Sequence, residues 1–226
     1  MFDFGPFFDH FDEILQGFWA TVRLAAVAGV ISLIIGTLLA GFRVAPVPVL
    51  RAFGTGYVSI VRNTPLTLVL LICAYGLNDA LALKFSDTTS TYYWWAMLGL
   101  SGYTGAFVCE TLRSGINTVP LGQAEAARSL GLTFAQSLRM IILPQAFRAI
   151  IAPLGSVLIA MIKNTTVAAA ANYGEVALVT KTIVDAPSFG SGVIPLFIGV
   201  AVGFLILTLP TGYFFGWLAK RMAVAR

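Results

Sequence analysis

The sequence predicts an all-α protein that crosses a membrane several times, and three observations support this fold class. Hydrophobic residues make up 58% of the chain and charged residues only 11%, whereas a soluble domain carries about a quarter charged residues. Five stretches approach the length of about 20 apolar residues that a helix needs to cross the hydrocarbon core. Lys and Arg gather in alternate connections. We therefore expect a five-helix transmembrane domain over residues 18–226, preceded by an extracytoplasmic segment over residues 1–17.

The acidic start of the chain does not have the character of a cleaved signal peptide. Its first 17 residues contain four carboxylates and no Lys or Arg, whereas a signal peptide begins with a basic region. The first apolar stretch is therefore expected to stay in the mature protein. The five expected spans are Phe18–Phe42, Gly54–Tyr75, Tyr92–Leu112, Ile150–Ala171 and Val193–Ala219.

The second span contains a polar break at Arg62-Asn63-Thr64-Pro65. Proline removes a backbone donor and disfavours helical geometry at the residue before it. We therefore expect this span to be kinked or locally unwound there. Irregular backbone at membrane depth is tolerated where it lines a cavity, often near a substrate site.

The distribution of Lys and Arg predicts the orientation. With the N-terminus outside and the C-terminus inside, nine cations fall in inner segments and two in outer loops, which is the positive-inside pattern. This topology explains the basic pI, so no nucleic-acid partner is expected. Residues 78–90 and 173–191 become outer loops. The nine inner cations are Arg43, Arg51, Arg113, Arg128, Arg139, Arg148, Lys220, Arg221 and Arg226.

The connection between the third and fourth spans, about residues 118–146, predicts two short cytoplasmic helices. Pro120 suits a first helical position, and good helix formers follow it. Gly131 supplies a stop. Thr133 and Gln136 then have the spacing of a capping box that starts a second helix.

The same segment resembles a known signature. Glu125-Ala126-Ala127, three residues, Gly131, nine residues, Ile141, one residue and Leu143-Pro144 are similar to the EAA motif in the membrane-spanning subunits of bacterial ABC importers. The resemblance implies the type I ABC importer permease fold, in which this segment is a coupling helix docked in a cleft of the ATPase. An ordinary amphipathic linker is the alternative. Leu143-Pro144 is expected to bend or end the second helix.

The resemblance assigns contact with the ATPase to the coupling helix. Glu125 is expected to make a polar contact, or alternatively to stabilise the helix start by its charge. Ala126 and Ala127 would permit a close fit, and Gly131 would set the turn. The expected coupling residues are Gln123, Glu125, Ala126, Ala127 and Gly131.

Apart from Arg23, which can snorkel to the outer interface, three charges remain inside the expected spans: Arg62, Glu110 and Lys163. A charge at the bilayer centre costs at least about 2.5 kcal/mol, so each should face protein or a watery cavity. They favour a substrate site. Two structural alternatives stay open: Glu110 pairs with Lys163 or Arg62, or the two cations reach the inner interface.

Blocks around these charges are similar to polar amino-acid uptake permeases, above all to actinobacterial glutamate-uptake permeases. The blocks are Arg62–Leu66 (RNTPL), Glu110–Ile116 and Lys163–Val167 (KNTTV). An amino acid needs an acceptor for its ammonium, a role for Glu110, and donors for its carboxylates. Glutamate, with two carboxylates and one ammonium, matches the two cations and one carboxylate of the expected site. Glutamine and aspartate are alternatives. A further alternative is that specificity lies wholly in an external binding protein. The expected substrate-binding residues are Arg62, Asn63, Thr64, Glu110, Lys163, Asn164, Thr165 and Thr166.

The sequence lacks the GxxxxGK[ST] phosphate loop, so we expect a transport subunit rather than an enzyme. No cofactor is expected in this chain, and ATP with Mg²⁺ would bind a partner ATPase dimer. The other expected partners are a second permease subunit, an extracytoplasmic amino-acid-binding protein and the lipid bilayer. A secondary transporter using Glu110 as an ion relay, or a purely structural membrane subunit, would be the other classes.

Overall fold

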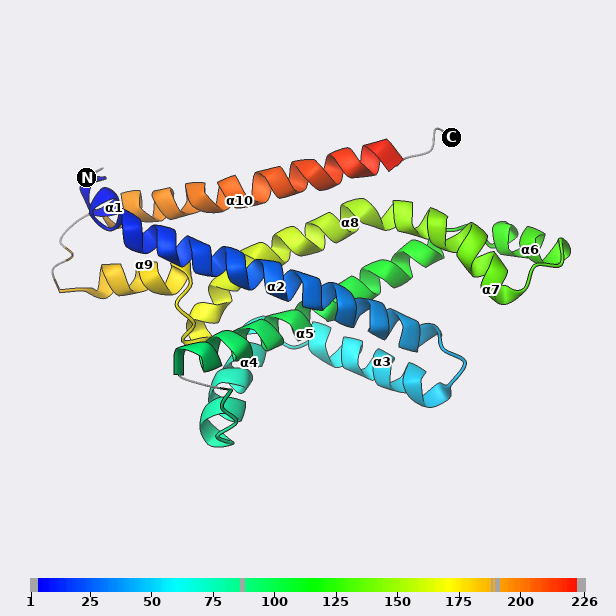
Figure 1. The fold of residues 1–226 in the computed structure, drawn as a ribbon, viewed down its shortest axis with the longest axis horizontal. Coiled ribbons are helices and arrows are strands. Elements are labelled where there is room, and N and C mark those ends of the chain that lie inside the picture. The colour runs from blue at the N-terminus through cyan, green and yellow to red at the C-terminus, as the bar shows by residue number, and fades with distance from the viewer. Residues whose placement is uncertain (1–3, 86–87, 188, 190–191, 223–226) are drawn as a thin grey trace.

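A computed structural model describes residues 4–85, 88–187, 189 and 192–222, which are mostly helical with no strand among them. Arg226, counted among the inner cations, lies outside these residues. Four long helices, α2, α5, α8 and α10, run along the molecule, and short helices connect them (Figure 1). In chain order the helices are α1 (Gly5–Asp9), α2 (Phe11–Val44), α3 (Pro48–Arg62), α4 (Leu66–Leu71), η1 (Ile72–Ala80), α5 (Thr88–Asn117), α6 (Leu121–Ser129), α7 (Phe134–Ser137), η2 (Leu138–Ile142), α8 (Leu143–Asn164), η3 (Thr165–Ala171), α9 (Val176–Asp185) and α10 (Val193–Met222).

Helix α5 is the centre of the bundle, because it packs against α2, α3, α4 and α8. Small residues let α2 and α5 approach closely. A Cβ on Gly36 would lie 2.4 Å from the Cγ1 atom of Val108, and a Cβ on Gly105 would lie 2.7 Å from Ile35. Close contact through small residues is the usual way for helices to associate in a membrane. The contact holds α5 against α2 and so places its functional side chains.

Among the residues that the structure describes, three helical segments are long and apolar enough to cross a membrane: Phe11–Val44, Phe134–Ala171 and Val193–Met222. They contain the first, fourth and fifth expected spans. Helix α5 contains the third span but does not pass the same apolarity criterion among the described residues. It carries buried polar residues such as Ser101 and Thr104, which is compatible with a helix enclosed by other helices. The number of five spans remains a prediction.

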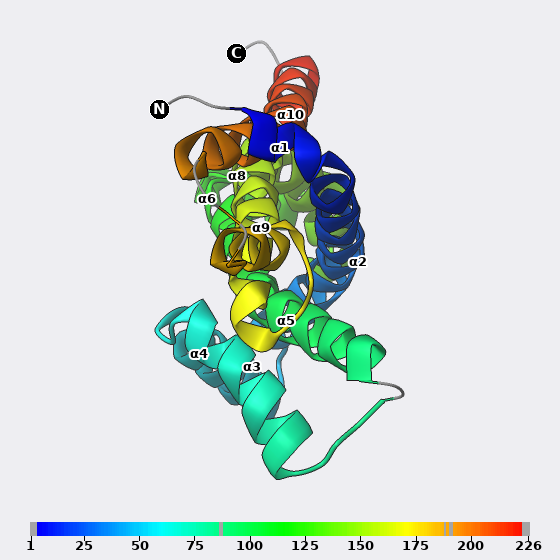
Figure 2. The same cartoon turned by 90° about the vertical axis from the view of Figure 1, so that its left-hand side faces the viewer.

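The expected break in the second span is confirmed. Helix α3 and the following helical segment Leu66–Ala80 are bent by 105° across residues 63–65, and the second piece leaves the direction of the bundle (Figure 2). The described part of the chain therefore has three candidate spans by length and composition, or up to four when the bent pair is counted as one span. Helix α4 packs against η3, so the break after α3 lies near the break at which α8 becomes η3.

The expected outer loop over residues 173–191 contains a helix that the sequence analysis did not predict, α9. Glu175 is its N-cap: Oε1 accepts hydrogen bonds from the backbone N–H groups of Ala177 and Leu178 at 3.0 and 3.1 Å. Thr21 of α2 donates a hydrogen bond to Oε2 of the same carboxylate. Glu175 is fully buried. A carboxylate at a helix N-terminus is favourable, and here it also ties α9 to α2.

The described part of the N-terminal segment consists mainly of α1 and the start of α2, and α1 packs on α10. Phe18 of α2 packs against Phe204 with 5.5 Å between the centroids of the inclined rings, and a Cβ on Gly199 would lie 2.3 Å from the Phe7 ring. Because α2 already begins at Phe11, residues 11–17 continue the helix of the first span.

Candidate functional sites: a coupling segment and a polar cavity

The turn after α6 has the geometry that the coupling signature predicts. Gly131 has φ of +76°, a left-handed conformation that glycine adopts without steric cost. Its N–H donates to the Arg128 carbonyl at 2.9 Å, and the Leu132 N–H donates to the Ala127 carbonyl at 3.1 Å. These two bonds form a Schellman motif, which satisfies the last carbonyls of a helix. The predicted stop at Gly131 is confirmed, although Pro120 is the N-cap of α6 rather than its first residue.

The predicted capping box at the next helix is also confirmed. The Gln136 N–H donates to Thr133 Oγ1 at 3.3 Å, and the Thr133 N–H donates to Gln136 Oε1 at 2.9 Å. After α7 the chain passes through the π-helical turn η2 into α8, whose first turn contains Pro144. Proline thus does not end the helical path here. It lies where its missing N–H costs least, with a wider turn before it.

The coupling residues differ in exposure. Gln123, Glu125 and Ala126 are exposed, whereas Ala127 is 1% exposed and packs inside its own subunit. Its small size therefore serves packing of α6, and Ala126 is the alanine open to a partner. The sequence analysis missed three large apolar side chains on the same segment, which are 77–82% exposed: Leu121, Leu130 and Phe134. The sequence could have indicated them, because large apolar residues are unexpected in a segment that was assigned to the cytoplasm.

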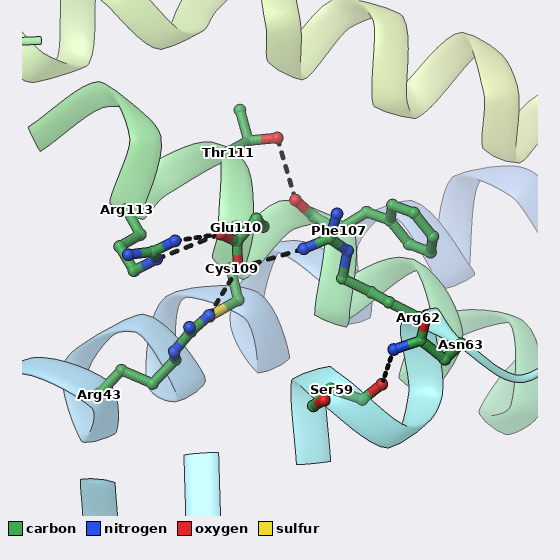
Figure 3. Close-up of polar contacts among 9 residues, drawn as sticks. All are labelled: Arg43, Ser59, Arg62, Asn63, Phe107, Cys109, Glu110, Thr111 and Arg113. Atoms are coloured by element: carbon green, nitrogen blue, oxygen red, sulfur yellow. Dashed lines mark hydrogen bonds and ion pairs between the residues drawn. The ribbon is translucent and has the colours of Figure 1, made fainter. Parts of the chain in front are cut away.

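Glu110 is the centre of a cluster of four charges (Figure 3). Its Oε2 accepts a hydrogen bond from Arg43 Nη1 at 2.6 Å, and its Oε1 accepts one from Arg113 Nε at 3.2 Å and another from Arg113 Nη2. Arg62 Nη1 lies 3.5 Å from Oε2 as a looser ion pair. The cluster joins α2, α3 and α5. With three guanidiniums and one carboxylate it has a formal charge of +2.

The structure thus contains one of the expected structural pairings. Glu110 pairs with Arg62, while Lys163 is exposed and joins no ion pair within the described part of the chain. The sequence analysis had treated Arg43 and Arg113 only as topology signals. The three-residue spacing between Glu110 and Arg113 on one helix was a usable signal for that pair; Arg43, 67 positions away, gave none.

Two cavities lie between α5 and α8. The first, of about 270 Å³, contains Arg62 and Glu110 in its lining, and we call it the Arg62 cavity. The second, of about 260 Å³, contains Asn164, and we call it the Asn164 cavity. The remaining lining of the Arg62 cavity is Phe107, Thr111, Ser114, Gly115, Thr118, Ala149, Ile150, Pro153 and Val157; that of the Asn164 cavity is Tyr103, Thr104, Phe107, Val157, Ala160 and Met161.

The other polar residues expected at the site bond mainly to their own helices. Asn63 donates to the Ser59 carbonyl at 2.7 Å, and Thr64 donates to the Ile60 carbonyl at 2.9 Å. Thr165 and Thr166 likewise donate to the carbonyls of Ile162 and Lys163. These bonds satisfy carbonyls where the helices break. Of the eight expected residues, Arg62, Glu110 and Asn164 line the two cavities.

Comparison with known proteins identifies the class to which this fold belongs. The family described as "Binding-protein-dependent transport system inner membrane component" matches residues 20–224, and the chain belongs to this family of ABC importer permeases. It is therefore a membrane-embedded transport subunit, and ATP hydrolysis resides in a separate component of such systems. The family implies an ATPase, a binding protein and a second permease as partners.

Within this family, the chain is similar to several individual amino-acid permeases. The chain is 46% identical over 230 residues to the glutamate transport system permease protein GluC of Corynebacterium efficiens, covering 99% of this chain and 97% of the relative. It is 34% identical to the probable glutamine ABC transporter permease protein GlnM of Bacillus subtilis, covering 95% of each. A crystal structure of an amino acid ABC transporter with histidines matches the fold with a TM-score of 0.88 and 24% identity, over 98% of this chain and 99% of that one.

Proposed function

We propose that this chain is the permease subunit of an ABC importer that carries an acidic amino acid, most specifically L-glutamate, across the cytoplasmic membrane. The observation that carries the proposal is the formal charge of +2 on the cluster around Glu110. Arg62 and Glu110 line the Arg62 cavity, and Arg43 and Arg113 are bonded to Glu110. A substrate with two carboxylates and one ammonium, net charge −1 at neutral pH, complements this excess. The glutamate permease GluC at 46% identity supports the same substrate.

The lone pairs of Glu110 suggest how the substrate would bind. A carboxylate has about four lone-pair sites, and bonds from Arg43 and Arg113 use three of them. The fourth faces Arg62, the most loosely held of the three cations. If Arg62 turns from Glu110 to a substrate carboxylate, the substrate ammonium takes its place on Oε2. Arg62 thus binds the carboxylate by a charge-assisted pair, and Glu110 binds the ammonium.

The remaining expected residues act around this centre in the proposal. Asn164 lines the adjoining cavity and offers an amide to the second carboxylate, and exposed Lys163 adds positive charge near the path. Asn63, Thr64, Thr165 and Thr166 fix the helix breaks beside it. Because Glu110 is engaged by three guanidiniums, it is poorly suited to relay protons, which argues against an ion-coupled mechanism. Aspartate and glutamine are the competing substrates for the test.

The coupling segment would transmit force from the ATPase. In the proposed orientation the N-terminus is outside and the C-terminus inside, and α6 docks in a cleft of the ATPase dimer. Gln123, Glu125 and Ala126 would contact that cleft, and Gly131 would set the angle of the segment. ATP and Mg²⁺ would bind the ATPase, with no cofactor in this chain. Closure of the ATPase dimer would then open the path toward the binding protein by shifting a two-state equilibrium.

The test is uptake by the reconstituted complex of both permeases, ATPase and binding protein, with glutamate, aspartate and glutamine supplied in turn. Arg62→Gln should raise the glutamate concentration for half-maximal uptake by about 10- to 100-fold, the size of a charge-assisted hydrogen bond. Lys181→Gln, on an exposed pair with Asp185, is the matched control. Equal affinity of wild type and Arg62→Gln for glutamate would refute the site, and a wild type that transports no acidic amino acid would refute the substrate.

A further inference from the structure

The Arg62 cavity and the Asn164 cavity follow one another along the same two helices. The lining runs along α5 from Tyr103 and Thr104 to Gly115, with Thr118 just past the end of the helix, and on α8 it runs from Asn164 back to Ala149. At 1.5 Å per residue, residues 103 to 118 span about 22 Å, a large part of the ~30 Å hydrocarbon core. The Arg62 cavity lies toward the end of α5 that leads into α6. Only Phe107 and Val157 belong to the lining of both cavities.

Of these two shared residues, Phe107 is the one suited to move. Valine is restricted at χ1 in a helix, whereas a Phe ring sweeps a wide arc when χ1 changes between rotamers. The Phe107 ring is only partly buried. It packs against the Tyr103 ring with 5.1 Å between centroids.

Arg62 also contacts the Phe107 ring. The Arg62 Cζ atom lies 5.6 Å from the centre of the ring, within the range of a cation–π contact, and the two side chains lie together in Figure 3. The same guanidinium forms the loose pair with Glu110 at 3.5 Å. The Arg62 side chain therefore contacts both the Glu110 carboxylate, which lines the Arg62 cavity, and the Phe107 ring, which lines both cavities.

We propose that Phe107 is the gate between the Asn164 cavity and the Arg62 cavity, and that Arg62 holds it closed until a substrate carboxylate draws the guanidinium away. The proposal rests on the proposed function. The substrate enters the Asn164 cavity, Arg62 leaves the ring to bind its carboxylate, and the released ring turns aside. The ion pair and the gate thus respond to the same event, so opening requires a substrate that carries a carboxylate.

The gate is tested by the accessibility of a cysteine in the Asn164 cavity. In a background with Cys73→Ser and Cys109→Ser, Thr104→Cys places a single thiol of this chain in that cavity's lining, at a side chain that is 2% exposed. A membrane-impermeant maleimide is added to the complex in vesicles, without ATP, on the side of α6. The gate variants are Phe107→Ala and Phe107→Leu. Phe204→Ala is the matched control, because Phe204 lies on α10 away from both cavities.

We expect Phe107→Ala to raise the labelling rate most, and Phe107→Leu to raise it by about two- to fivefold, the equivalent of one lost cation–π contact. Phe204→Ala should label like the parent. Both Phe107 variants should also let glutamate leak down its gradient without ATP. Labelling of both at the parent rate would overturn the gate. Since labelling needs no substrate, a changed rate in a complex that transports no glutamate would keep the gate and reject the proposed function.

Discussion

Gly131 and Gly122 form a matched pair that tests whether backbone conformation at the coupling turn matters for transport. A Cβ at either position would meet no atom within 4 Å, and only Gly131 has a positive φ, +76°. Any cost of Gly131→Ala therefore comes from the left-handed backbone rather than from a clash. That cost is about 1–2 kcal/mol for a residue with a Cβ, which lowers the population of the native turn by about 5- to 30-fold relative to alternatives.

We expect substitutions at Gly131 to differ in how well the turn tolerates them. Asn should be tolerated best, since its short side chain bonds locally in this region, Ala should be intermediate, and the β-branched Val should be worst. Gly122→Ala, inside α6, should be neutral or stabilising by up to about 1 kcal/mol, because Ala favours the helix. The assay is the ratio of glutamate imported to ATP hydrolysed by the reconstituted complex, with thermal unfolding of each variant as the check on folding.

Coupling should follow the same order, with Gly131→Val hydrolysing ATP but importing little, while remaining inserted and folded. Full uptake by Gly131→Val would refute the reasoning. So would a loss of coupling in Gly122→Ala as large as in Gly131→Ala, because a general sensitivity of α6 to any added methyl group would then explain both.

Three further changes probe the other contacts. Glu110→Gln should raise the glutamate concentration for half-maximal uptake without weakening ATPase assembly, and should lower the unfolding free energy by about 2 kcal/mol, since three guanidiniums lose a partly exposed carboxylate; unchanged transport kinetics would reject its role as a ligand. Burial raises the pKa of Glu175, which lies outside the spanning segments, from 4.5 to about 7. The folded state then binds the extra proton between these values, so stability should fall as pH rises from about 4.5 to 7 and level off above. Glu175→Gln should remove this slope in thermal unfolding, with up to roughly 3 kcal/mol between the variants at pH 8, and parallel curves would contradict it. Thr133→Ala should destabilise the capping box by about 1 kcal/mol, measured as faster amide exchange in α7 with α10 as the internal reference.

The coupling segment was predictable in detail because its signals are local. A glycine stop and a capping box each depend on residues within a few positions, and Gly131, Thr133 and Gln136 form the expected contacts. The bend at residues 63–65 was predictable for the same reason, since proline acts on its neighbours. Which side of α6 is buried was not predictable, because nothing in the neighbouring sequence distinguishes the buried Ala127 from the exposed Ala126.

The polar cluster was predictable in part: Arg62 and Glu110 were expected, with their pairing as one alternative, whereas Arg43 and Arg113 were not expected as members. Hydropathy marked Arg62 and Glu110 as charges within apolar stretches, but the contacts of Glu110 with Arg43 and Arg62 depend on how α2, α3 and α5 pack. Helix α9 was missed because the segment is short and polar residues surround it, so its stability depends on the N-cap by Glu175 and on burial against α2. Such tertiary contacts leave no periodic trace in one sequence.

The net positive charge of three guanidiniums around one carboxylate also affects whether inorganic cations can leak through the permease. A cell interior is electrically negative, and 100 mV draws a monovalent cation inward with about 2.3 kcal/mol. Two uncompensated positive charges about 8 Å away repel the same cation by roughly 4 kcal/mol at an effective dielectric constant of about 20. For a sodium or potassium ion that approaches Glu110, this repulsion is larger than the energy that the membrane potential supplies. The cluster that receives an anionic solute would in this way help the cell to retain its ion gradients.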